Sequence, residues 1–305
     1  MRLFNKLISY ILSFMPRRLV WLFSKRYIAG ETISDGLNAA KKLNKERILV
    51  TVDLLGEFIR TLAQAEENRD KYLEIIDQFS GQKIQGNFSL KPTMFGLLID
   101  KEACYGYIRE IVKRAVENES FVRIDMEDSQ CVDREIELFR RLWGEFPSSV
   151  GLVLQAYLYR TQNDLEELSR LNSETAPLNF RICKGIYIEP GNIAYQDYQV
   201  VRNRFLEILE FMFRNKMYVG IATHDKYLIE GAYDLIGKYK VPKNRYEFQM
   251  LYGVTPELRQ SIINAGHTMR VYLPFGKEWF GYSTRRLKEN PKMMWHIIKA
   301  LFVRG

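Results

Sequence analysis

Polar and charged side chains stand at the ends of several short apolar runs in this sequence. Lys184 closes one run, Asp125 closes a second, and His224 follows Thr223 at the end of a third. A charged group that is buried at such a place is costly unless it is paired or used for function. Brought together, such residues would form one polar site with both signs of charge. Other runs end in, or lie close to, Asp53, Glu57, Lys91, Gln155, Arg181, Gln249 and Tyr272.

Two consecutive arginines, Arg285 and Arg286, follow the last of these runs. With Ser283 or Thr284 as the helix N-cap, both arginines would lie in the first turn of a helix. Two guanidinium groups at a helix N-terminus would bind a carboxylate or a phosphate. The alternative is a pair of solvated arginines tied to a nearby glutamate. Lys91, at the mouth of the same site, favours the anion-binding interpretation.

Lys184 admits more than one interpretation. A lysine at the end of a barrel strand can be the Schiff-base nucleophile of a lyase or an aldolase, and it can equally be a partner in a salt bridge. Gly185, which follows it, indicates close approach of the backbone to a bulky ligand. His224 stands between Thr223 and Asp225, which suggests hydrogen bonding to a polar ligand, although a histidine satisfied within the core is the usual alternative.

Other kinds of site find little support in the sequence. The acidic run from Asp125 to Asp128 has no nearby histidine, so we expect no metal. Neither the G-x-G-x-x-G fingerprint nor a P-loop occurs, which argues against a Rossmann or Walker nucleotide site. The three cysteines have no CxxC spacing and indicate a reducing compartment.

Eight short apolar runs, separated mostly by segments of helical periodicity, supply the elements that must position these residues. Strand alternating with helix predicts parallel pairing, and eight units predict the α/β class with a distorted (β/α)8 TIM-like barrel, whose site lies at the carboxyl ends of the strands. We expect the barrel over residues 46–305 and a helical, amphipathic extension over 1–45. The predicted strands are Ile48–Asp53, Phe88–Lys91, Phe121–Met126, Val150–Ala156, Phe180–Lys184, Tyr218–Thr223, Tyr246–Leu251 and Arg270–Leu273.

The first thirty residues contain six basic residues, counted as lysine and arginine, and no acid. Apolar residues between the charges follow the period of a helix, too briefly to span a bilayer, and no small-residue cleavage site follows. We therefore expect a cytoplasmic protein, whose amphipathic segment either lies on an anionic membrane or packs on the barrel. The formal net charge of +8 favours anionic partners. A basic adaptor would carry its charge on a helix face or a tail, so we expect no nucleic-acid partner.

The same residues, in this order, resemble those of the proline dehydrogenases, flavin-dependent barrel enzymes of proline catabolism. The resemblance runs from about Val50 to Glu289 and covers the whole predicted barrel. Each of its motifs is weak alone, and together they are specific. The motifs are Asp53-Leu-Leu-Gly-Glu57, Ser89-Leu-Lys91, Arg123-Ile-Asp125-Met-Glu127, Gln155-Ala-Tyr157, Arg181-Ile-Cys-Lys184-Gly-Ile-Tyr187, Ala222-Thr-His224, Gln249-Met-Leu251-Tyr-Gly253, Arg270-Val-Tyr272-Leu-Pro-Phe-Gly276 and Tyr282-Ser-Thr-Arg285-Arg286-Leu-Lys-Glu289.

The resemblance implies a role for each site residue. Asp125 would order the polar network on the substrate side, Arg181 would hydrogen-bond near flavin N5, and Glu57 would pair with Arg285 and gate the site. The carboxylate of proline would be held by Lys91, Arg285 and Arg286, and its ring would pack against Leu251, Tyr272 and Tyr282. The FAD would be lined by Met126, Gln155, Arg181, Lys184, Gly185, Ile186, Thr223 and His224.

The resemblance also implies the reaction. L-Proline would be oxidised to 1-pyrroline-5-carboxylate by hydride transfer to FAD, as the first step of proline degradation to glutamate. The electrons would pass to a membrane quinone, which gives the basic amphipathic segment a role at the inner face of the cell membrane. One residue departs from the family pattern, since Ile186 stands where alanine is more common.

Overall fold

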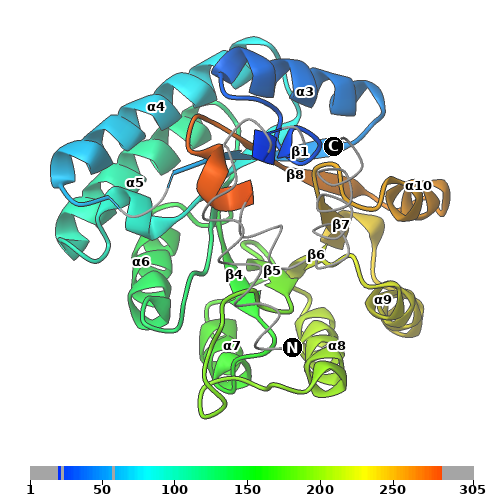
Figure 1. The fold of residues 1–305 in the computed structure, drawn as a ribbon. Helices are drawn as coiled ribbons and strands as arrows, with labels where there is room; N and C mark the ends of the chain where they lie inside the picture. The colour runs from blue at the N-terminus through cyan, green and yellow to red at the C-terminus, as the bar shows by residue number, and fades with distance from the viewer. Residues whose placement is uncertain (1–19, 22–23, 57–58, 284–305) are drawn as a thin grey trace, which may run out of the picture.

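Eight parallel strands form one closed barrel, in which each strand pairs with its neighbour in sequence and β8 pairs with β1. The computed structural model describes residues 20–21, 24–56 and 59–283, and Figure 1 shows the ring of helices around the strands. The predicted (β/α)8 class is thereby confirmed. The strands are β1 (Leu49–Leu54), β2 (Gly86–Leu90), β3 (Val122–Ile124), β4 (Val150–Gln155), β5 (Asn179–Cys183), β6 (Tyr218–Ala222), β7 (Tyr246–Leu251) and β8 (Met269–Phe275).

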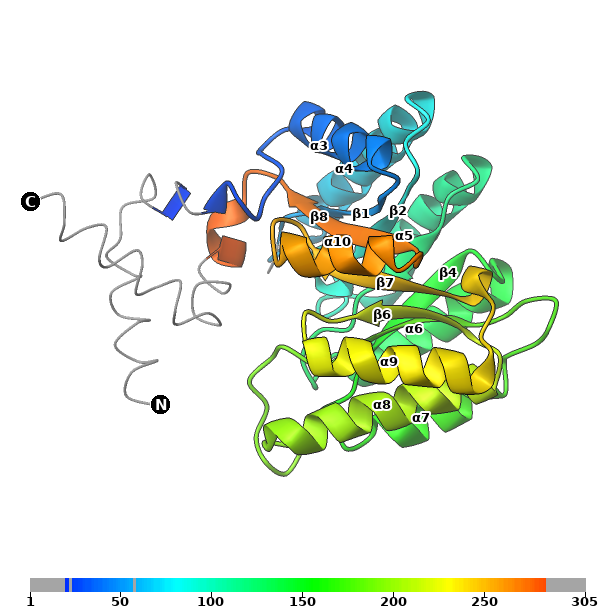
Figure 2. The ribbon, with the colours of Figure 1, turned by 90° about the vertical axis from the view of Figure 1, so that its right-hand side faces the viewer.

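The helices lie outside the barrel and bury their apolar faces against the strands (Figure 2). Several begin at a side-chain cap, which satisfies backbone N–H groups that lack a partner in the first turn. Thr32 forms a capping box with Asp35 at the start of α3, and Asp225 caps the start of α9. The helices are α3 (Ile33–Lys45), α4 (Leu62–Gly81), η1 (Pro92–Phe95), α5 (Lys101–Glu117), α6 (Val132–Glu145), α7 (Thr161–Ser169), α8 (Tyr198–Arg214), α9 (Lys226–Tyr239), η2 (Lys243–Arg245) and α10 (Pro256–Asn264).

All eight predicted strands are present, and the bounds of the seventh agree in full. The eighth is longer than predicted at both ends. It begins one residue earlier, at Met269, and it continues through Pro274 to Phe275. Proline has no N–H to donate, but hydrogen bonding continues at this edge, where the carbonyl oxygen of Phe275 accepts from the Leu55 N–H at 2.8 Å.

The inside of the barrel is polar, which is unusual for this architecture, where branched apolar residues dominate. Polar side chains bond to one another and to carbonyl oxygens there. The Nη1 of Arg123 on β3 donates to the Asn179 carbonyl on β5, which is not a neighbouring strand, at 2.7 Å, and Thr51 on β1 donates to Asn87 on the adjacent β2 at 2.6 Å. The alternate residues of the same strands, such as Val52 and Ile124, are fully buried in the apolar layer under the helices. The barrel therefore has a hydrophobic wall and a hydrogen-bonded interior.

Gly151 on β4 is needed to accommodate this interior. A methyl group at this position would lie 2.3 Å from the Asn179 carbonyl oxygen and 2.5 Å from the Arg123 Nη1. We expect Gly151→Ala to lower the free energy of unfolding by about 2–3 kcal/mol, because overpacking forces backbone shifts. Gly106→Ala is the matched control: nothing lies within 4 Å of the added methyl in α5, and alanine favours a helix by about 1 kcal/mol. Equal urea midpoints for the two variants would contradict this account.

Candidate active site

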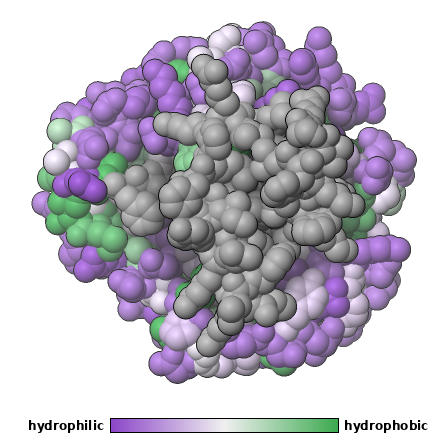
Figure 3. All heavy atoms as spheres, in the orientation of Figure 1, coloured by the Kyte–Doolittle hydropathy of each residue, from purple (hydrophilic) through white to green (hydrophobic). Residues whose placement is uncertain are grey.

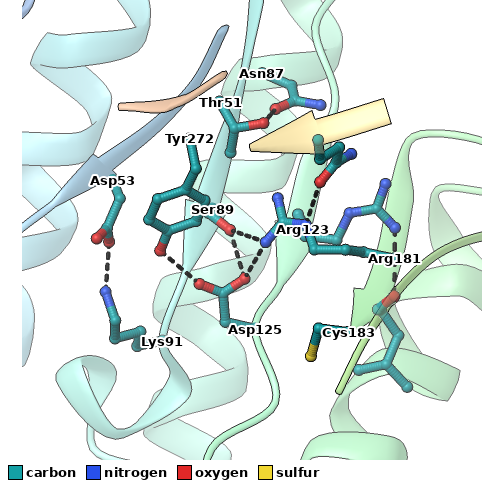
Figure 4. A network of polar contacts seen from close by, with 12 residues as sticks. Thr51, Asp53, Asn87, Ser89, Lys91, Arg123, Asp125, Arg181, Cys183 and Tyr272 are labelled. Carbon is teal, nitrogen blue, oxygen red and sulfur yellow. Dashed lines mark hydrogen bonds and ion pairs between the residues drawn. The ribbon is translucent and has the colours of Figure 1, made fainter. Parts of the chain in front are cut away.

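Asp125 is the centre of a polar network at the carboxyl end of the barrel (Figure 4). It follows β3 directly, and its backbone N–H donates to the Leu90 carbonyl at 2.8 Å, which fixes the start of the loop. Its Oδ1 accepts from the Ser89 hydroxyl at 2.6 Å and from the Arg181 Nη1 at 2.9 Å, while its Oδ2 accepts from the Tyr272 hydroxyl at 2.8 Å. One carboxylate thus joins four different strands or strand ends.

Arg181, on β5, is held on two sides. Its Nε donates to the Gln249 Oε1 at 2.6 Å, and the Gln249 amide donates in turn to Glu247 at 2.7 Å. Gly220 leaves the room for this amide, because a methyl group there would lie 2.4 Å from the Gln249 Nε2. Among the described residues, the buried Nη2 of Arg181 has no hydrogen-bond partner. Arg181 is thus held in place while its Nη2 presents a donor that no residue in the described part of the chain fills.

Tyr272 bonds to Asp125 on the side away from the Arg181 contact (Figure 4). Its ring centre is 5.2 Å from the guanidinium carbon of Arg181. Burial, together with the negative charges of Asp125 and Asp53, raises the pKa of Tyr272 well above its ordinary value. Tyr272 therefore stays a neutral phenol. Its hydroxyl donates a hydrogen bond to Asp125, and its ring presents an aromatic face to the site.

Lys91 and Asp53 form a second buried ion pair beside this network, with 2.5 Å between Nζ and Oδ1. Burial opposes the charged form of Lys91, but the charges of Asp53 and Asp125 outweigh it and raise the pKa of Lys91. The side chain of Lys91 is 12% exposed and that of Asp53 is fully buried, so Lys91 is the partner of this ion pair that lies nearer to solvent.

Lys184 joins a cluster at the rim rather than standing alone. Its Nζ lies 3.2 Å from Asp225 Oδ2 and 3.2 Å from the Tyr198 hydroxyl, and Arg202 binds the same carboxylate with two nitrogens, Nε at 2.9 Å and Nη2 at 2.8 Å. Although burial opposes ionisation, Arg202, Tyr198 and Lys184 hold the pKa of Asp225 far below its ordinary value. This geometry fits the salt-bridge interpretation of Lys184.

Gly185 and His224 make contacts within the chain that account for their residue types. Gly185 has φ +112°, and a methyl group there would lie 2.2 Å from the Tyr157 ring; the close approach expected of a ligand is made by this tyrosine. The Nε2 of His224 accepts from the Leu251 N–H at 3.1 Å, and its Nδ1 lies 3.0 Å from the Thr255 hydroxyl. This pairing places the imidazole proton on Nδ1.

The other residues predicted for the cofactor lie at the same end of the barrel. Met126 is buried next to Asp125, and the Gln155 amide donates to the Glu127 carbonyl at 2.8 Å. Thr223 is also buried and accepts from the backbone of Asp225 at 3.1 Å. Ile186, by contrast, is 41% exposed. Leu251 ends β7, and Tyr282 is buried in the helical residues 279–283.

The prediction that Ser283 is the N-cap of the helix carrying the two arginines is wrong. The chain is already helical from residue 279 to residue 283, so Ser283 lies within a helix and not at its N-cap. Trp279 is buried at the start of this helix, and its packing lets the helix begin earlier than the polar residues suggested. Three predicted residues, Glu57, Arg285 and Arg286, lie outside the described part of the chain.

Two buried polar residues, Ser89 and Glu135, were not identified as site residues from the sequence. Ser89 appeared only as part of a motif, since an uncharged hydroxyl in an apolar run carries no strong signal. Glu135 on α6 is fully buried and accepts from the Glu127 N–H at 3.0 Å. Burial and the charge of Glu127 raise its pKa well above the ordinary value. It shares the spacing of the buried Val132 and Leu138, so the helical period could have identified it.

Metal ligation finds no support in the described residues, where no group of three histidine, cysteine or acidic side chains is placed to hold a metal ion. The described helices likewise include none with the length and apolar composition required to cross a bilayer.

The sequence matches the model of the family described as "Proline dehydrogenase" over residues 36–295. It is 33% identical over 291 residues to the proline dehydrogenase of Deinococcus radiodurans, covering 94% of this chain and 92% of that protein. It is 31% identical over 280 residues to proline dehydrogenase 1 of Bacillus subtilis strain 168, covering 92% of this chain and 91% of that protein.

The fold is similar to that of a solved structure, proline utilization A from Bdellovibrio bacteriovorus inactivated by N-propargylglycine. The TM-score is 0.82 at 25% sequence identity, and the match covers 88% of this chain but 32% of that longer chain. The similarity therefore concerns one part of that protein, whereas the single-activity relatives match along nearly their whole length.

The Asp125–Arg181 pair is expected to be essential for stability. We expect Asp125→Asn to lower the free energy of unfolding by about 3 kcal/mol, because loss of one partner leaves the other charge buried and uncompensated. Asp77→Asn is the matched control, since Asp77 pairs with Arg114 at 2.6 Å on the exposed surface, where such pairs contribute less than about 1 kcal/mol. Urea unfolding followed by circular dichroism measures both changes, and similar losses for the two variants would refute the assignment.

Proposed function

Because this chain belongs to the proline dehydrogenase family, and is therefore a proline-oxidising enzyme, we propose that it is a flavoenzyme that converts L-proline to 1-pyrroline-5-carboxylate. The FAD would lie at the carboxyl end of the barrel, beside Arg181 and Asp125. This reaction would be the first step of proline degradation to glutamate.

The observation that supports the proposal is the buried Nη2 of Arg181, which has no hydrogen-bond partner among the described residues, on a guanidinium held in place by Gln249 and Asp125. Bound FAD would supply the hydride acceptor and would carry negative charge once reduced. A fixed guanidinium beside flavin N5 would stabilise that charge without reorganising. The remaining contacts would come from Met126, Gln155, Lys184, Gly185, Ile186, Thr223 and His224.

The substrate would bind on the side of the network formed by Tyr272. This ring is fixed by Asp125, so it offers a rigid apolar face to the pyrrolidine ring, together with Leu251 and Tyr282. Lys91, already near the mouth, would contribute to binding the carboxylate with Arg285 and Arg286. Holding the zwitterion by its carboxylate would orient its C5 toward the hydride acceptor, which is the positional part of catalysis. Glu57 would pair with Arg285 and gate this pocket.

We propose further that the enzyme passes electrons to a membrane quinone as a peripheral protein at the inner face of the cell membrane. Nine large apolar side chains of the described residues are exposed, and all but Val116 belong to loops that follow strands or to the first turns of helices. Figure 3 shows such hydrophobic surface on the face viewed in Figure 1. The eight residues are Leu98, Ile99, Tyr159, Ile186, Ile188, Tyr198, Val200 and Tyr227.

Anaerobic addition of L-proline tests the flavin proposal. We expect the purified protein to show the visible absorption of oxidised flavin and to lose it when L-proline is added.

The variant Arg286→Ala tests the carboxylate assignment. It should keep its flavin content, while kcat/KM falls by tens to a thousandfold, because a carboxylate contact of about 2–4 kcal/mol is lost. A protein that stays colourless and inert after reconstitution with FAD would end the proposal, and turnover of Arg286→Ala within twofold would end the carboxylate assignment.

Deletion of residues 1–19 tests the membrane proposal and leaves Val20 and Trp21 in place. We expect weaker binding to vesicles of anionic lipid and slower quinone-linked turnover, because a basic amphipathic segment binds an anionic surface. Turnover with a soluble dye should not change. Vesicles of neutral lipid are the control for charge. Unchanged binding to anionic vesicles would refute this role for the segment.

A further inference from the structure

Residues 24–31, together with Val20 and Trp21, form a segment that lies along the ends of β7 and β8; we call it the N-terminal strap. The Ala29 N–H donates to the Pro274 carbonyl at 2.9 Å, and the Gly276 N–H donates to the Gly30 carbonyl at 3.0 Å. The strap therefore continues the hydrogen bonding of β8 beyond the barrel, next to the strand that carries Tyr272.

The strap also contacts the loop after β7. The Arg26 Nε donates to the Gly253 carbonyl at 3.3 Å. Gly253 has φ +72°, and a methyl group there would lie 1.8 Å from the Arg26 carbonyl oxygen. Any other residue at this position would push the strap away, so the loop that follows Leu251 is shaped to receive it.

Trp279 links the strap to the helical residues 279–283, which include Tyr282. Trp279 is 4% exposed, its indole N–H donates to the Glu31 Oε1 at 2.6 Å, and its ring centre lies 4.7 Å from that of Trp21. A hydrogen bond to a carboxylate is stronger than one between neutral groups. The start of this helix is thus fixed from the side opposite to the barrel strand.

Glu31 is itself held in place. Its backbone N–H donates to the Asp35 Oδ2 at 3.1 Å, and Asp35 forms the capping box of α3 with Thr32. Gly30 has φ +134°, and a methyl group there would lie 2.4 Å from the Asp35 Cβ. The carboxylate that receives Trp279 therefore projects from a rigid helix start.

We propose that Glu31 is a positioning residue for substrate: through Trp279 it fixes the position of the helical residues 279–283, which include Tyr282. The inference rests on the proposed role of Tyr282 in binding proline. Glu31 touches neither substrate nor cofactor in this account. Its loss changes the affinity of the site and spares the chemical step.

The test compares Glu31→Ala, Glu31→Gln and Glu46→Ala in the full-length enzyme. Glu46 is exposed at the other end of α3, which makes it the matched control. We expect Glu31→Ala to raise KM for L-proline about tenfold, with kcat within twofold and the flavin spectrum unchanged. Glu31→Gln keeps an acceptor oxygen for the indole and should restore KM to within twofold of the wild type, as should Glu46→Ala.

Hydrogen exchange of the peptide that spans residues 276–283 supplies a readout independent of turnover. We expect faster exchange in Glu31→Ala and not in Glu31→Gln. Unchanged exchange, or faster exchange with an unchanged KM, would overturn the proposal, and so would a glutamine variant that behaves like the alanine variant. If Glu31→Ala fails to fold, Trp279→Phe removes the same hydrogen bond and keeps a packed ring, with the same expected rise in KM. A wild-type enzyme that bound no flavin would contradict the proposed function, while the exchange result would still show whether Glu31 holds residues 279–283 in place.

Discussion

The ion pair between Asp125 and Arg181 lies in the interior of the barrel, where a charge without a partner is several kcal/mol too costly to retain. Asp125 meets this constraint with three donors from three other strands, and Arg181 meets it with acceptors on two sides. Each partner is fixed by strands that must close in register for the contacts to form. The hydrophobic wall of the barrel and its polar interior therefore stabilise one another, because neither persists without the other.

A second feature of the interior is an excess of positive charge below this pair. Arg270 is compensated by Glu247 at 2.6 Å, but the guanidinium of Arg123 donates only to amide oxygens, those of Leu152 and Asn179, within the described part of the chain. Burial and the nearby charge of Arg181 lower the pKa of Arg123 to about 9, which still leaves it charged at neutral pH. Arg123 is therefore a buried cation that donates only to neutral oxygen atoms within the described residues.

The barrel was predictable because its signal is local and repeated. Eight apolar runs separated by helical segments fix the number and order of strands, and parallel strands place all their carboxyl ends together. The pairing of individual side chains was not predictable, since it depends on which distant residues face each other. Gly185 illustrates this: its type suggested close approach by a bulky ligand, and the structure places the ring of Tyr157 against it. Glu135 was missed for another reason: a charged residue on a helix is expected at the surface, whereas this one is fully buried.

The position of the N-terminal strap follows from the length of α3. A helix of 13 residues is about 20 Å long, and the six residues of β1 also span about 20 Å. Since α3 precedes β1 and packs against β1 and β8, it returns the chain along the full height of the barrel. The residues before α3 must then lie at the carboxyl end, beside the end of β8, which pairs with β1. The closure of the barrel thereby brings a segment from the start of the chain against the helical residues 279–283, which follow its last strand.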